Sequence, residues 1–126
     1  MPFLPTRIHG VIDYAMGGML IILPFALRFP TQWSAMVPVG LGLGAILYSL
    51  MTDYELGAYP LLGMRAHLAL DVASGLLLAA SPWLVGFAPL IWMPHVILGA
   101  LEVGVALVTQ TTPALGPVES QPASVD

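Results

Sequence analysis

Charged residues are scarce in this chain of 126 residues, which has three basic and seven acidic residues, 8% in all. Soluble proteins carry about 25% charged residues. The few basic residues are scattered and form no basic patch, so the chain has no feature typical of a nucleic-acid-binding protein. Cysteine is absent, which excludes disulfide bonds, thiolate metal sites and cysteine nucleophiles.

Hydrophobic residues dominate the chain instead: they make up 58% of it, and the mean hydropathy is +0.90. Residues 33–51 and 72–94 contain no charged residue. Each run is long enough to cross a hydrocarbon layer about 30 Å thick. Two further apolar segments, near 8–29 and 91–110, complete four predicted spans. The sequence therefore predicts an all-α, four-transmembrane-helix bundle whose surroundings are the lipid bilayer.

The segment before the first span lacks a basic start, a short apolar run and a cleavage site, so we expect the first helix to be retained. Arg7 and Arg65 flank one side of the predicted bundle, and Arg28 flanks the other. Cytoplasmic loops carry an excess of arginine and lysine, so we expect both termini in the cytoplasm. Residues 52–64 form an acidic connection, which we expect to be a turn or short surface helix and a soluble contact surface.

Two helical hairpins repeat each other in sequence. The matched positions are Arg7/Arg65, His9/His67, Asp13/Asp71, Gly17/Gly75 and Pro24/Pro82 in the first and third spans, with Gly40/Gly99 and Thr52/Thr111 in the second and fourth. A unit of two spans returns to its starting side, so the pseudo-twofold axis should follow the membrane normal. We predict hairpin repeats over about 7–57 and 65–116. They build one membrane domain, 1–111, before a flexible, Pro/Ser-rich tail at 112–126.

Ionisable residues occur inside the predicted spans, where they are costly and usually face the bundle interior with a partner. His9 and Asp13 lie one helical turn apart and share a helix face, as do His67 and Asp71. We therefore expect one intramembrane polar cluster. Its predicted members are His9, Asp13, His67, Asp71, Glu102 and Tyr48, and Arg7 and Arg65 are expected at the helix mouths, where they neutralise carboxylates near the headgroups.

Several uses of this cluster stay open. The sequence favours a structural staple, in which each histidine bonds an aspartate within its hairpin or crosswise, with no cofactor. Two histidines and carboxylate oxygens also suit Zn, Fe or Mn, and the ligands would then be His9, His67, Asp13 and Asp71. Alternatively, His9 and His67 serve as axial haem ligands. A proton relay through Asp13, Asp71 and Glu102 is the last alternative.

The segment Ser81-Pro82-Trp83 closes the helix that begins near His67 and Asp71. With these residues the chain resembles the SPW-repeat integral membrane proteins, small bacterial proteins made of paired hydrophobic segments. The resemblance covers about residues 7–112, although the first half has Leu23-Pro24-Phe25 in place of Ser-Pro-Trp. It implies a four-helix domain in the bacterial cytoplasmic (inner) membrane, and it carries no established activity.

The sequence contains no nucleophile motif or phosphate-binding motif, so we expect no enzymatic activity. Small size and short loops favour an accessory or structural subunit that associates with other membrane-protein subunits, such as those of an energy-converting complex, or with copies of itself. The alternative is a free-standing metal-, haem- or proton-handling protein built on the duplicated His-Asp motif. His95 follows Trp92 and Pro94, and we expect it to be an interfacial or capping residue and not a ligand.

Overall fold

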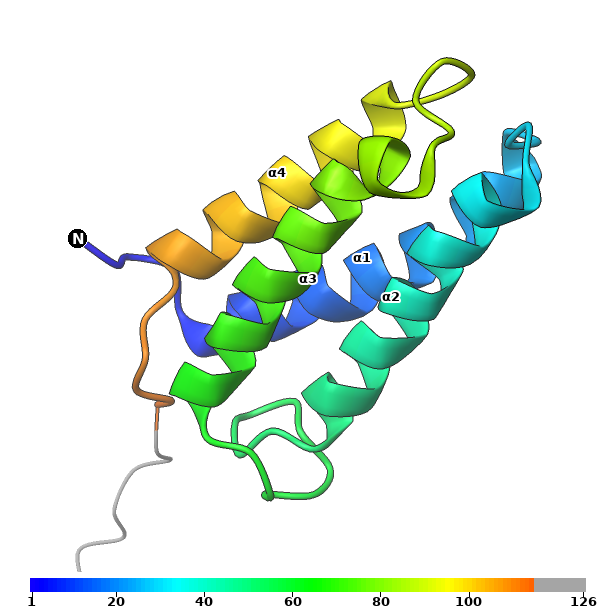
Figure 1. Cartoon of the computed structure of the whole chain (residues 1–126). Coiled ribbons are helices and arrows are strands. Elements are labelled where there is room, and N and C mark those ends of the chain that lie inside the picture. Colours follow the sequence, from blue (N-terminus) through cyan, green and yellow to red (C-terminus); the bar gives the residue numbers. More distant parts are fainter. Residues whose placement is uncertain (115–126) are drawn as a thin grey trace, which may run out of the picture.

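The computed structural model describes residues 1–114 as four helices that run alternately up and down (Figure 1). These helices are α1 (Thr6–Ala26), α2 (Gln32–Leu50), α3 (Met64–Val85) and α4 (Met93–Val108). Residues 1–114 contain no strand. The predicted all-α class and helix bundle are therefore confirmed. Most of the predicted tail, from residue 115 onward, lies outside the described residues.

Three of the helices, α1, α2 and α3, are long and apolar enough to cross a membrane. α4 is also apolar, but its 16 residues extend over only about 24 Å at 1.5 Å per residue, so a full fourth crossing stays a prediction. Large apolar side chains such as Leu47, Leu76 and Leu107 are exposed on the outside of the bundle. Such a surface suits lipid tails, and the chain is a multi-pass membrane protein.

Glycines bring the helices of each hairpin together. α1 packs along α2, and α3 packs along α4 (Figure 1). A Cβ atom on Gly42 of α2 would lie 2.7 Å from the carbonyl oxygen of Gly17, and one on Gly75 of α3 would lie 2.7 Å from that of Gly99. A side chain has no room at either contact, so glycine permits the short distance between the paired helices.

The second and fourth helices correspond in a register that differs from the predicted one. The equivalent pairs are Gly42/Gly99 and Thr52/Thr109, whereas the predicted pairs Gly40/Gly99 and Thr52/Thr111 are wrong. Isolated β-bridges at the end of the bundle support the equivalence of Thr52 and Thr109, because Thr52 pairs with Leu62 and Thr109 pairs with Leu4. Both sequences are rich in the same small and apolar residues, so chance identities suggested a shifted alignment.

The start of the chain and the end of α4 lie together, and Figure 1 shows the blue amino terminus beside the orange end of α4. Leu4 N–H donates to Val108 O at 2.9 Å, and Gln110 N–H donates to Leu4 O at 2.9 Å. The loop between α2 and α3 lies at this end as well, with Asp53 N–H donating to Leu62 O at 2.8 Å. Both ends of the helical domain therefore lie on one side, as predicted.

The acidic connection between α2 and α3 contains turns and no helix, and it folds against the end of the bundle. Tyr54 is buried in it. The Thr6 hydroxyl donates to Glu55 Oε2 at 2.7 Å, and Ala114 N–H donates to Glu55 Oε1 at 3.0 Å. Burial raises the pKa of the Glu55 carboxyl, but hydrogen bonds from its own backbone, Thr6 and Ala114 outweigh burial and hold the pKa below its usual value.

Candidate intramembrane metal centre

Two histidines and two aspartates meet in the centre of the bundle. His9 and Asp13 come from α1, and His67 and Asp71 come from α3, so the two hairpins meet here through these side chains. All four side chains are buried. One potential ligand atom from each of them lies within 4.8 Å of the other three.

The contacts in this His-Asp site run both within and between the hairpins. His9 Nε2 lies 2.9 Å from Asp71 Oδ2 and 3.0 Å from Asp13 Oδ2. His67 Nε2 lies 2.8 Å from Asp13 Oδ2 and 3.3 Å from Asp71 Oδ2. The two Nε2 atoms are 3.3 Å apart. For each histidine, the shorter contact is the crosswise one, to the aspartate of the other hairpin.

Two threonine hydroxyls determine which histidine nitrogen faces the centre. Thr52 Oγ1 donates to a carbonyl oxygen one turn earlier on α2, at 2.6 Å, and therefore accepts from His67 Nδ1, at 2.7 Å. Thr109 Oγ1 likewise donates to a carbonyl oxygen one turn earlier on α4, at 2.6 Å, and accepts from His9 Nδ1, at 2.8 Å. Both Nδ1 atoms therefore carry a proton, and both Nε2 atoms point at the carboxylates.

The geometry of the site is close to that of a four-coordinate metal centre. Tetrahedral Zn²⁺ has bonds of about 2.0–2.1 Å to histidine and carboxylate, which separates its ligand atoms by about 3.3 Å. The five separations that involve a histidine Nε2 are between 2.8 and 3.3 Å, and all four potential ligand atoms lie within 4.8 Å of one another, so a small movement of the side chains would make room for an ion. Two aspartates also balance the charge of a divalent cation, which lowers the cost of burying it.

Haem does not fit between the same two histidines. Axial ligands stand on opposite faces of the macrocycle. The Nε2 atoms of His9 and His67 are 3.3 Å apart, and their rings are held from behind by the two threonines. This separation leaves no room for a macrocycle with iron at its centre.

Thr52 and Thr109 are the site residues that the sequence analysis missed. Ligating histidines usually donate their second N–H to a fixed acceptor, which sets the orientation of the ring, and these two hydroxyls are such acceptors. The available signal was a threonine at the end of the second and fourth spans. The shifted alignment hid it, because it paired Thr52 with Thr111.

Two other predicted members of the polar cluster lie beside the His-Asp site. Tyr48 OH donates to Asp71 Oδ1 at 2.6 Å, so Tyr48 is joined to the site directly. Glu102 is buried, but its hydrogen bond within residues 1–114 is to Ser74 Oγ and not to a histidine or aspartate. Glu102 therefore lies at the edge of the cluster.

Arg7 and Arg65 do not pair with the aspartates of the His-Asp site in the part of the chain that the structure describes, although the charge of Arg7 helps to lower the pKa of the Glu55 carboxyl. Both arginines are second residues of their helices, α1 and α3, as expected, but their side chains are exposed and form no ion pair within residues 1–114. The aspartates face histidines instead. An arginine at a helix mouth reaches water more easily than the bundle centre, because its long side chain extends toward the surface.

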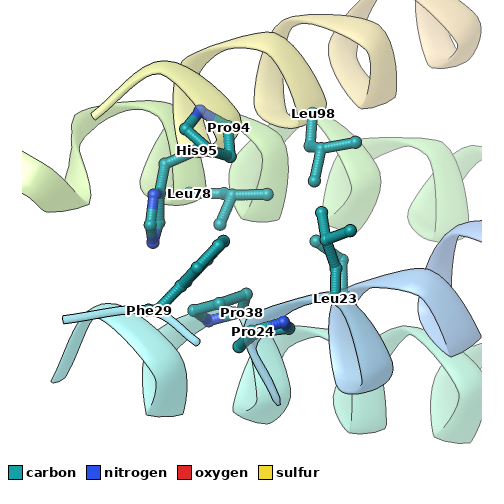
Figure 2. Close-up of a pocket in the computed structure, with 9 residues that line it drawn as sticks. Leu23, Pro24, Phe29, Pro38, Leu78, Pro94, His95 and Leu98 are labelled. Atoms are coloured by element: carbon teal, nitrogen blue, oxygen red, sulfur yellow. The ribbon is translucent and has the colours of Figure 1, made fainter. Parts of the chain in front are cut away.

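His95 is the third residue of α4, and its side chain does not cap that helix; an interfacial depth for it stays a prediction. His95 is buried, its Nε2 donates to Ser34 O at 2.8 Å, and its ring packs against Phe29 and Phe87, with centroids 5.3 and 4.9 Å away. Figure 2 shows it at an apolar pocket whose other labelled residues are Leu23, Pro24, Phe29, Pro38, Leu78, Pro94 and Leu98. The pocket lies at the far end of the bundle from Thr109, so His95 is separate from the His-Asp site.

The Ser-Pro-Trp segment lies at the end of α3. Pro82 is buried inside α3. Its carbonyl oxygen accepts from Gly86 N–H at 3.1 Å and Ala88 N–H at 2.8 Å, and the helix ends at Gly86, which has the left-handed conformation. Trp83 is exposed beside Trp92, with ring centroids 6.1 Å apart. A family model described as the SPW repeat domain matches residues 7–109.

The chain belongs to the SPW repeat family. The matched range includes both His-Asp motifs and ends at Thr109. The SPW repeat family is a family of small membrane proteins and is not a known enzyme family. No curated protein and no solved structure matches the chain.

Proposed function

We propose that this SPW repeat protein binds one divalent transition-metal ion between its two hairpins and that the ion clamps the bundle. The observation that carries the proposal is the convergence of two histidine Nε2 atoms, aimed by Thr52 and Thr109, on two aspartate oxygens. Zn²⁺ suits this mixture of nitrogen and oxygen in a tetrahedron. Four protein ligands fill that shell, which is typical of structural and not catalytic sites.

The cofactor-free staple favoured by the sequence is the second candidate, and the crosswise distances of 2.8 and 2.9 Å support it. In a staple, each Nε2 must carry a proton in order to donate to a carboxylate. The two N–H groups would then point at the same centre from atoms 3.3 Å apart and would repel each other. A cation instead accepts all four lone pairs at once, so the geometry supports the metal clamp better.

The metal content of the purified protein tests the proposal. Protein exposed to Zn²⁺ in detergent and then desalted should hold one equivalent of zinc by mass spectrometry. His9→Ala and His67→Ala should lose most of their zinc on desalting, because a site with one protein ligand fewer, completed by water, binds the ion less tightly. His95→Ala is the matched control and should keep its zinc, since His95 lies in the separate apolar pocket. A wild type without stoichiometric zinc, iron or manganese after such exposure would favour the staple.

Removing the threonine hydroxyls should weaken binding without removing a ligand. Thr52→Val or Thr109→Val takes away the acceptor of one histidine Nδ1–H, and losses of this kind lower metal affinity by about 10–100-fold. Thr111→Val is the control, because Thr111 is exposed. Competition with a chelating dye measures the affinity. Equal effects of the changes at Thr52 and Thr111, with none at Thr109, would contradict the observed register.

We also propose that the protein is an accessory or structural subunit in the bacterial cytoplasmic membrane, with both termini in the cytoplasm. The short connections and the small four-helix domain support this role, and the expected absence of enzymatic activity agrees with a closed, four-ligand site. Purification of tagged protein from its native membrane in mild detergent tests the association. A chain that is monomeric and alone would contradict it.

A further inference from the structure

A polar branch leaves the His-Asp site on one side and leads deeper into the bundle. It begins at Asp71, whose Oδ1 accepts a hydrogen bond from Tyr48 OH at 2.6 Å. Ser74 lies one helical turn beyond Asp71 on α3, with its Oγ 3.3 Å from the Asp71 carbonyl oxygen. Ser74 Oγ donates to Glu102 Oε1. The branch therefore places Glu102 of α4 close to the His-Asp site.

The fold itself does not require this branch, because the other half of the repeat lacks it. With Gly42 equivalent to Gly99 and His9 equivalent to His67, the positions equivalent to Glu102, Tyr48 and Ser74 hold Ala45, Val105 and Met16. Ala45 is buried like Glu102. A methyl group thus serves the packing at one of two equivalent positions, so packing alone does not require a carboxyl group at the other.

Glu102 lies where a carboxylate anion is costly. Its side chain is buried, and Oε2 has no hydrogen-bond partner among residues 1–114. No arginine of residues 1–114 forms an ion pair with it. The titratable groups that face it are His9 and Asp13 of α1, Tyr48 of α2 and Asp71 of α3. Two of these four are carboxyl groups, and a single hydroxyl cannot compensate an unpaired buried charge.

We propose that Glu102 is a proton-binding site within the membrane: it is held as the neutral acid, with the Ser74 hydroxyl donating to Oε1 and the bound proton on Oε2. The proposal goes beyond the metal clamp, because it holds whether or not the His-Asp site contains a metal.

Infrared spectroscopy of chelator-treated, metal-free protein at neutral pH tests whether Glu102 is held as the neutral acid. We expect the C=O stretching band of a protonated carboxyl group in the wild type, and we expect Glu102→Gln to lose it. Ser74→Ala should keep the band but move it to higher frequency, because the carboxyl group loses its one hydrogen bond. No band in the wild type, or a band that persists in Glu102→Gln, would overturn the proposal. Glu102→Ala, with the residue of the equivalent position, checks by circular dichroism that the bundle folds without the carboxyl group.

Hydrogen–deuterium exchange tests whether the band belongs to a proton that Glu102 binds reversibly. On transfer to D₂O the carboxyl band should shift to lower frequency, because the O–H group becomes O–D. A band that does not shift in D₂O would overturn the proposal. Because these measurements use metal-free protein, their failure is distinct from a failure of the proposed metal clamp.

Discussion

Replacing His67 with alanine is expected to lower the free energy of unfolding by about 3–5 kcal/mol, because it leaves two buried carboxyl groups with one histidine between them. The His67 side chain is fully buried and lies within 3.3 Å of both Asp13 and Asp71. Unfolding in detergent, followed by circular dichroism, measures the loss. A change below about 1 kcal/mol, typical of an exposed position, would contradict the central place of His67 in the bundle.

The effect of zinc on unfolding in detergent should distinguish the metal clamp from the staple. A ligand present at about 100 times its dissociation constant stabilises a protein by about 2.7 kcal/mol, so wild-type protein should melt at a higher temperature with zinc and at a lower one with chelator. His67→Ala and Asp71→Asn should both lose this response, since a neutral amide is a poor substitute for an anionic ligand. If the site is a staple, by contrast, zinc should not change the melting temperature, and Asp71→Asn should lower it less than His67→Ala does.

Gly99→Ala should destabilise the bundle by about 3 kcal/mol. A Cβ atom at this position would overlap the carbonyl oxygen of Gly75 and approach the Ala79 backbone nitrogen to 2.7 Å. Helix backbones cannot yield as a flexible side chain can, so α3 and α4 must separate and lose contacts along their length. The same unfolding measurement in detergent gives the size of the effect.

Gly104→Ala on the same helix is the matched control, and the sign of its effect should be opposite. No atom lies within 4 Å of a Cβ atom built on Gly104, and alanine is favoured over glycine inside a helix by about 0.5–1 kcal/mol. Equal destabilisation by the two changes would mean that glycine matters here for the helix itself and not for the contact between α3 and α4.

The sequence determined the features that depend on local composition and spacing. Long apolar runs identified the helices, because a backbone in hydrocarbon must bond to itself. The recurrence of His9 and Asp13 as His67 and Asp71 predicted an internal polar cluster, because residues four apart share a helix face and buried ionisable groups need partners. The structure places these four residues together, so their assembly could be inferred before any contact was known.

Only the tertiary structure decided the features that depend on how the two hairpins fit together. The distance between Gly75 and Gly99, and not sequence identity, sets the register of α3 and α4. This register brings Thr109 of the second hairpin to His9 of the first, and Thr52 of the first to His67 of the second. Sequence spacing could not show these partners, because each bond joins residues of different helices, and their relative position depends on packing along the whole interface.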